Sequence, residues 1–206
     1  SMKASIKEND RSVAARAAQL SQRTNQFNLT LNRYDEEQIG RLMASAGSRV
    51  FTLELEDKFG SYGTVGMMVV RNPGLFHPGE NGYVTDVLGT WEIETLCLSC
   101  RALGWGAEQA FVAEVARTLA AEGAARLQGT YRASDANRAA APFYAMMGFA
   151  QDSAREDLWK MDLAASVPAV PDWIEIVSPE TAVERIIPAG MNLFDLKKRW
   201  LDAAAQ

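Results

Sequence analysis

A glycine-rich turn between an apolar strand and a long helix is the clearest candidate for chemistry in this sequence. It has the spacing R-x-x-G-x-G and leads directly into the helix. Glycines let a backbone approach an anion, and the first N–H groups of a helix lack partners within it. The turn could hold a pyrophosphate or a phosphopantetheine, although a tight strand-to-helix turn explains the glycines equally well. The residues in question are Arg101, Ala102, Leu103, Gly104, Trp105, Gly106 and Ala107.

A second candidate unit follows one strand and one loop later. Asn137, Ala140 and Tyr144 have the spacing N-x-x-A-x-x-x-Y, and Gly148 and Phe149 come next. Asn137 is expected at the head of a short helix, where its side chain could cap the helix or bind a ligand. The Tyr144 phenol could protonate a departing thiolate as a general acid. Taken alone, the pattern favours a plainer interpretation, in which Tyr144 is a core aromatic residue and Gly148 ends the helix.

The two cysteines, Cys97 and Cys100, stand just before the glycine-rich turn. A redox C-x-x-C pair opens a helix, whereas this pair closes a strand, and a zinc site needs two further ligands. Alternation along the strand predicts Cys97 as a small core residue. Cys100 lies beside Arg101 and near a helix start, which both favour a thiolate. Cys100 could therefore accept an acyl group as a thioester, or it could be an inert buried thiol.

Three further residues are candidates for contact with a substrate. Asp57 and Tyr62 flank a predicted hairpin turn and could bind a hydroxylated acyl group. His77 is the only histidine and lies in a loop rich in proline and glycine. It could act as a base near the site. The plainer alternative is that Asp57 and Tyr62 make local turn hydrogen bonds and that His77 is simply solvated.

Composition narrows the possible function classes. The chain has 206 residues, of which 48% are hydrophobic and 23% charged, as in an ordinary globular domain. A net charge of -5 argues against non-specific nucleic-acid binding, and one histidine excludes a multi-histidine metal site. No apolar run approaches the length of a membrane span, and the first residues lack an apolar signal region. We therefore expect a cytoplasmic protein without metal, nucleic-acid partner or membrane contact.

The periodicity of apolar residues predicts the elements that position these side chains. The order of helices and strands is typical of a mixed α/β fold with a partly antiparallel sheet flanked by helices. We expect an N-terminal helix and linker in residues 1–23, the main domain in 24–163, and a C-terminal extension in 164–206. Helices are predicted at 10–22, 35–46, 106–122, 139–147 and 194–204, and strands at 24–34, 50–57, 64–71, within 82–99, at 126–132 and at 158–163.

The two candidate units together resemble the GNAT acyltransferase superfamily over about residues 25–163. In that family the first motif holds the pyrophosphate of acyl-coenzyme A. By resemblance, Asn137 would meet the pantetheine arm and Tyr144 would be the general acid. The cofactor implied is coenzyme A, or the phosphopantetheine of a carrier protein.

A narrower resemblance is to the C-terminal half of FkbH-like proteins of polyketide pathways. It rests on AAQLSQRTNQFNLTLNRY at 17–34, DKFGSYGTVG at 57–66 and LSCRALGWGAE at 98–108. Members of this family join a HAD-type phosphatase domain to a GNAT-like domain. They are associated with placing a glyceryl unit, derived from 1,3-bisphosphoglycerate, on an acyl carrier protein. The stretch QRTNQFNLT is its most distinctive part, because ordinary acetyltransferases do not need it.

Two departures from the family pattern bear on function. The chain has no D-x-D-x-T/V phosphatase motif, so the resemblance covers the acyltransferase half only. Trp105 stands where the pattern has a small or basic residue. We expect transfer of a glyceryl or similar hydroxyacyl unit to an acyl carrier protein, with a HAD-type phosphatase as a further partner. The alternatives are an acetyl-coenzyme A-dependent N-acetyltransferase and a non-catalytic docking scaffold.

Overall fold

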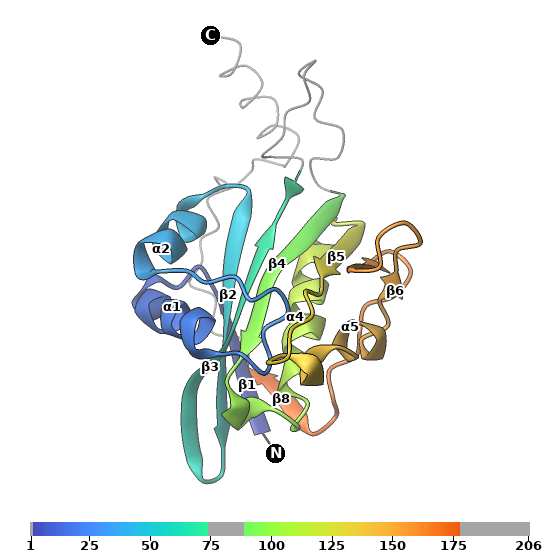
Figure 1. Cartoon of the computed structure of the whole chain (residues 1–206). Coiled ribbons are helices and arrows are strands. Elements are labelled where there is room, and N and C mark those ends of the chain that lie inside the picture. Colours follow the sequence, from blue (N-terminus) through green and yellow to red (C-terminus); the bar gives the residue numbers. More distant parts are fainter. Residues whose placement is uncertain (1, 74–88, 178–206) are drawn as a thin grey trace, which may run out of the picture.

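The computed structural model describes residues 2–73 and 89–177, and one sheet runs through them (Figure 1). Its strand order is β6-β7-β5-β4-β3-β2-β1-β8. The pairs β1–β8 and β4–β5 are parallel and the others are antiparallel. The strands are β1 (Met2–Glu8), β2 (Ser48–Asp57), β3 (Gly60–Arg71), β4 (Thr90–Leu98), β5 (Arg126–Thr130), β6 (Ala150–Gln151), β7 (Leu158–Asp162) and β8 (Ile174–Val177).

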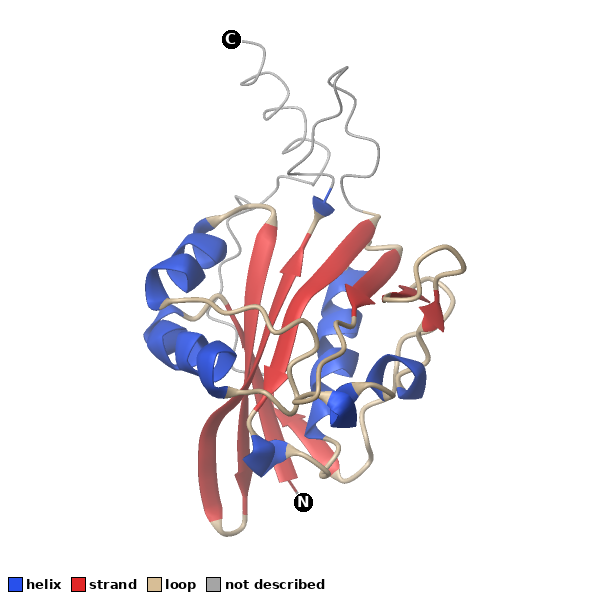
Figure 2. Ribbon diagram, viewed as in Figure 1, coloured by secondary structure: helices blue, strands red, loops and turns tan. Residues whose placement is uncertain are grey.

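Helices cover both faces of the sheet (Figure 2). The α-helices are α1 (Ala14–Arg23), α2 (Glu36–Ala44), α4 (Ala107–Ala121) and α5 (Phe143–Met146). Short 3-10 helices are η1 (Arg11–Val13), η2 (Cys100–Ala102) and η3 (Arg138–Ala140). Alternate residues of β3 divide between two buried clusters: Met67 packs with the α1–α2 side, whereas Met68 packs with the α4 side. The predicted α/β fold with a mixed, partly antiparallel sheet flanked by helices is confirmed.

Local sequence explains where several elements begin and end. Asp35 starts α2 with a reciprocal capping box, in which its side chain accepts from the Gln38 N–H and the Gln38 side chain accepts from the Asp35 N–H. The expected β2–β3 hairpin and the long helix before Gly123 are both present. The short helix expected at 139–147 is split into η3 and α5, because Pro142 has no N–H to continue a helix.

The sheet extends beyond the boundaries expected for the main domain. β1 pairs with β2 on one side and β8 pairs with β1, so residues before 24 and after 163 belong to the same sheet. Neither strand is predicted from the sequence, since four of the seven residues of β1 are polar and β8 has only four residues. His77 and the amphipathic helix expected at 194–204 lie outside the described residues.

The strand expected at 24–34 is wrong for most of its length. The alternation of Phe27, Leu29 and Leu31 suggested a strand, but Leu31 adopts a left-handed backbone with φ of 60° and turns the chain away. The segment makes a single isolated bridge, from Asn28 to Cys97 of β4. The connection between α1 and α2 therefore crosses β4 and approaches the loop after β5 (Figure 1).

Candidate functional site

The end of β4 presents one cysteine to solvent and buries the other. The Ser99 N–H donates to the Val65 carbonyl of β3 at 2.7 Å, and η2 begins directly after it. Cys100 and Arg101 are exposed on η2. Cys97 points instead into the α1–α2 side of the core, where burial raises the pKa of its thiol to about 12. Of the two thiols, Cys100 is thus the one that can meet a partner molecule.

Arginine side chains from two elements gather beside this turn. The Arg16 Nε of α1 donates to the carbonyl of Thr64. Thr64 precedes Val65, whose carbonyl accepts from the Ser99 N–H. Burial lowers the pKa of Arg16, and the positive charges of Arg101 and Arg23 lower it further. These guanidinium groups therefore lie close enough to repel one another. We call Arg16, Arg23 and Arg101 the arginine cluster.

Aromatic side chains from three segments meet around the glycine-rich turn. The rings of Tyr62 and Trp105 make an edge-on contact at 5.3 Å between centroids. The indole N–H of Trp173 donates to the Trp105 carbonyl at 2.8 Å. The Tyr62 hydroxyl donates to Asp57 at 2.9 Å, and the Phe59 N–H is the main reason that the pKa of Asp57 is lowered. Asp57 and Tyr62 thus make the local turn hydrogen bonds that were the plainer alternative.

The start of α4 is covered by the chain itself. Gly104 and Gly106 both have φ of 81°, which glycine adopts without strain. A Cβ on Gly106 would lie 3.1 Å from Pro171 and 3.3 Å from Trp173. Glu108, in the first turn, has a buried carboxylate oxygen with no hydrogen-bond partner among the described residues, and burial raises its pKa. The Glu108 carboxyl group therefore lies in the first turn of α4, where the helix start would favour an anion.

The gap between β4 and β5 is filled by the segment Phe27–Leu29, which we call the inserted segment. The two strands pair only from Thr90 to Ile93, opposite Arg126–Gly129. Beyond that, the Leu29 N–H donates to the Leu96 carbonyl at 3.1 Å and the Leu98 N–H donates to the Phe27 carbonyl at 3.0 Å. The part of β4 that does not pair with β5 is therefore paired with the inserted segment.

The side chain of Asn137 is fully buried and its polar atoms are used within the protein. Its amide donates to the carbonyls of Asn28 at 2.8 Å and Arg132 at 2.9 Å. Its oxygen accepts from the Ser134 N–H at 2.8 Å. Asn137 thus holds the inserted segment and its own loop, and the contact with a pantetheine arm that the resemblance implied stays a prediction.

Tyr144 belongs to the core in this structure. Only 1% of its surface is exposed, and its hydroxyl has no hydrogen-bond partner among the described residues. The hydroxyl packs against the backbone of β5, since a Cβ on Gly129 would lie 2.0 Å from it. Burial raises the pKa of the phenol far above its ordinary value. Because a catalytic acid must touch the reacting atoms, this burial does not support the general-acid role of Tyr144, which stays a prediction of the resemblance.

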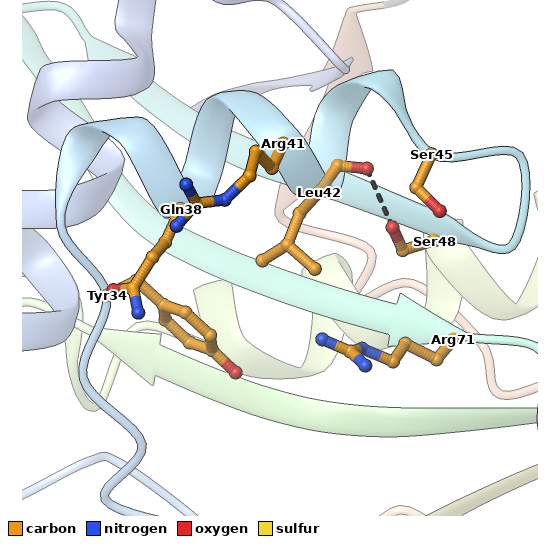
Figure 3. A pocket seen from close by; sticks show the side chains of 7 residues that line it. All are labelled: Tyr34, Gln38, Arg41, Leu42, Ser45, Ser48 and Arg71. Carbon is orange, nitrogen blue, oxygen red and sulfur yellow. Dashed lines mark hydrogen bonds between the residues drawn. The ribbon is translucent and has the colours of Figure 1, made fainter. Parts of the chain in front are cut away.

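A separate cavity of about 340 Å³ lies on the α2 side of the sheet (Figure 3). The Tyr34 hydroxyl beside it donates to Glu94 at 2.5 Å, and Glu94 also pairs with Arg71. Arg71 ends β3, six residues beyond the Val65 that contacts Ser99, a separation of about 20 Å along a strand. The cavity is therefore distinct from the Cys100 surface. It is lined by Tyr34, Gln38, Arg41, Leu42, Ser45, Ser48 and Arg71.

Within residues 2–73 and 89–177, no three His, Cys, Asp or Glu side chains are grouped so that they could hold a metal ion. No helix in the same part of the chain is long and apolar enough to cross a membrane.

Comparison with solved structures identifies the architecture. A GNAT-family acetyltransferase from Streptococcus pneumoniae superposes with a TM-score of 0.53 at 16% identity, over 77% of this chain and 98% of its own. The ribosomal-protein-S18-alanine N-acetyltransferase from Escherichia coli gives 0.51 at 17% identity, over 77% and 91%. A Salmonella typhimurium protein solved with its cofactor acetyl-CoA gives 0.53 at 12% identity, over 82% and 98%. This is the GNAT fold. No family model and no curated protein matches the sequence.

Two parts of the chain lie in the space that the resemblance assigns to coenzyme A. A pyrophosphate at the start of α4 would meet Pro171, Trp173 and the carboxylate of Glu108. An extended pantetheine arm along β4 would meet the inserted segment. Neighbouring residues cover the Gly106 side of the turn, whereas Gly104 is open and Arg101 and Trp105 are exposed.

Within this GNAT fold, the structure brings together some predicted residues and separates others. Tyr62 and Trp105 contact each other, and Cys100 and Arg101 are exposed on η2, which precedes Trp105 in the chain. Tyr144 lies in the core. Arg16 and Arg23 were not predicted as site residues because they lie far from the motifs along the chain, and the structural role of Asn28 was not predicted either. The distinctive QRTNQFNLT stretch was the available signal, since it contains both Arg23 and the inserted segment.

Proposed function

We propose that this chain is an acyltransferase domain in which Cys100 receives an acyl group and passes it to the thiol of a carrier protein. The observation that supports this most is the exposure of Cys100 on η2, next to Arg101 and the arginine cluster. The fold supports acyl transfer in general. The cysteine distinguishes this proposal from direct transfer, because a thiol can form a covalent intermediate.

The proposed reaction has two balanced steps. The Cys100 thiol loses its proton to solvent, and its sulfur attacks the carbonyl carbon of an activated acyl donor. The C–S bond forms and the donor's leaving group departs with the electron pair of the broken bond. The carrier thiol then attacks the thioester carbonyl, the acyl group moves to the carrier sulfur, and Cys100 leaves as a thiolate that regains a proton. No oxidation or reduction occurs in either step.

The acyl unit that we propose is glyceryl or a similar small hydroxyacyl group, in a polyketide-type pathway. This part rests on the FkbH-like resemblance, together with a HAD-type phosphatase as the source of the activated unit. The arginine cluster suits an acyl carrier protein, which is usually acidic around its pantetheine, because opposite charges steer encounter. The exposed aromatic rings of Trp105 and Trp173 border the same surface.

The test is intact-protein mass spectrometry with a glyceryl donor, a HAD-type partner and a holo carrier protein. The expected result is a glyceryl mass on this chain, followed by the same mass on the carrier. Cys100→Ala should abolish both, while the matched control Cys97→Ala should keep both, since Cys97 is buried. If the carrier is acylated equally fast by Cys100→Ala, the thioester relay is wrong. If the chain changes nothing, the catalytic proposal fails.

The second candidate is an N-acetyltransferase that uses acetyl-coenzyme A, and the similarity to acetyltransferases supports it equally at the level of fold. It predicts that a free amine becomes acetylated and that Cys100→Ala is fully active. The covered start of α4 and the filled β4–β5 gap count against this candidate. They also agree with a non-catalytic docking scaffold, which would bind the carrier without any turnover.

A further inference from the structure

We propose that the inserted segment is a built-in strand that permanently closes the β4–β5 gap, so that the acyl group on Cys100 passes to a carrier-borne thiol and not to free coenzyme A. The second half of this inference rests on the proposed function. The first half concerns the folded chain alone and can be tested without any activity.

The gap itself follows from the pairing of β4 and β5. The strands run parallel and separate after Ile93 and Gly129, although β4 continues to Leu98. An unpaired strand edge of this kind offers N–H and C=O groups to any extended molecule with amide groups. A pantetheine arm contains such amides and could add to this edge. Whether a pantetheine arm can bind here therefore depends on what occupies this edge of β4.

The inserted segment takes up this edge by backbone hydrogen bonds on both sides. On the β4 side it pairs through the Leu29 N–H and the Phe27 carbonyl. Just beyond the end of β5, the Leu29 carbonyl accepts from the Arg132 N–H at 2.8 Å. The segment thus joins β4 to the start of the loop after β5.

Side chains on either side of the bridge fix the segment in place. Leu29 is fully buried, and the ring of Phe27 packs edge-on against Phe143 at 5.1 Å between centroids. The Thr30 hydroxyl donates to the Glu94 carbonyl at 2.9 Å, and the Asn32 amide donates to the same carbonyl at 3.0 Å. An incoming arm would have to displace buried apolar surface as well as hydrogen bonds.

Asn137 holds the inserted segment to the loop after β5. Its amide donates to the carbonyl of Asn28 in the middle of the bridge, and both residues are fully buried. The Asn28 side chain in turn accepts from the Leu31 N–H at 2.8 Å and donates to the Thr24 carbonyl at 3.3 Å. The residue that the motif suggested for a cofactor thus holds the chain's own backbone.

The start of α4 is covered independently of the inserted segment. Pro171 and Trp173 pack on Gly106, and Glu108 places a carboxylate in the first turn of α4. A helix start favours an anion, but here the anion is supplied by the protein. Both the arm and the pyrophosphate of coenzyme A therefore lack a place, whereas Cys100 remains exposed beyond the end of the inserted segment.

The first experiment measures amide hydrogen exchange on the whole chain, with and without millimolar acetyl-coenzyme A, alongside calorimetric titration with the same compound. We expect slow exchange at Leu29, Leu98 and Arg132, unchanged by the compound, and no heat of binding. Binding accompanied by faster exchange at Leu29 would overturn the proposal, since the segment would then be a displaceable plug. Binding without such a change would also overturn it, because a second route would exist.

The second experiment locks the segment with a disulfide. Asn28 and Cys97 face each other across an antiparallel bridge whose hydrogen bonds flank the pair, so their Cα atoms should be about 4.5 Å apart, within disulfide range. Asn28→Cys is oxidised and compared with its own reduced form. Asn28→Ser, which cannot form the bond, receives the same oxidant as the matched control and reports any damage to Cys100.

The two forms of Asn28→Cys should acylate the carrier at equal rates if the segment never leaves the gap. Loss of transfer on oxidation, with recovery on reduction, would show that the segment must move and would overturn the proposal. If neither form nor the wild type acylates a carrier, the proposed function fails, while the exchange and binding measurements still decide whether the gap is closed.

Discussion

The side-chain amide of Asn137 donates a hydrogen bond of 2.8 Å to the backbone carbonyl of Asn28, a residue 109 positions earlier in the chain. This contact joins the loop after β5 to the connection between α1 and α2, across the end of β4. Both partners are fully buried, so neither group has water as an alternative partner. We therefore expect the loss of Asn137 to lower the stability of the free protein, whereas the loss of a ligand-binding asparagine would lower ligand affinity.

Asn137→Ala should destabilise the fold with or without any ligand. Removing the amide leaves the buried carbonyl of Asn28 and the N–H of Ser134 without this partner, which costs about 1–3 kcal/mol of unfolding free energy. Chemical denaturation measures the change. Gln26→Ala, at an exposed position of the same connection, is the control and should be nearly neutral. A fully stable Asn137→Ala protein would contradict the structural role.

Tyr144→Phe should leave acyl transfer unchanged and keep or increase stability. Its hydroxyl is buried without a partner among the described residues, so removing it relieves a desolvation cost of about 1–2 kcal/mol. Tyr34→Phe is the matched comparison, because the Tyr34 hydroxyl donates to Glu94 and its loss should destabilise by about 1.5–3 kcal/mol. A large drop in transfer rate for Tyr144→Phe, at unchanged stability, would restore the general-acid role.

The two cysteines should differ in alkylation and in their effect at alkaline pH. Iodoacetamide should label Cys100 in the native protein and reach Cys97 only on unfolding. The pKa of Cys97 is raised from 9.0 to about 12, so above pH 9 the unfolded chain loses this proton first. The stabilising contribution is full below pH 9 and is lost as pH rises toward 12.

Comparison with Cys97→Ala isolates this contribution from the tyrosines and lysines that titrate in the same range. The wild type should lose about 1.4 kcal/mol more per pH unit than the variant between pH 9 and 12. Parallel stability curves for the two proteins would show that Cys97 is not held in a dry core.

Arg101→Gln should weaken the encounter with an acidic carrier more than the chemical step. Removing one charge from the arginine cluster should raise the KM for the carrier about threefold to tenfold at low salt, with a smaller effect at high salt. Arg138→Gln, an exposed arginine paired with Asp135, is the control. Equal effects of both variants, or an effect that salt does not reduce, would argue against local steering.

Local patterns in the sequence were sufficient for the elements whose signals lie within a few residues. The capping box of α2, the apolar stripe of α4 and the hairpin joining β2 to β3 depend on side chains close together in the chain. The overall class of fold followed from the order of these elements. The exposure of Cys100 and burial of Cys97 followed in part from alternation along a strand.

The tertiary structure decided what the same residues contact. The alternation of Phe27 and Leu29 is equally consistent with a full strand or a short insertion, and only the separation of β4 and β5 settles which occurs. Asn137 and Tyr144 have motif spacing, but their surroundings come from segments more than ten residues away. Spacing along a chain specifies which side chains are available, whereas long-range packing determines whether a cofactor or the protein itself occupies the space beside them.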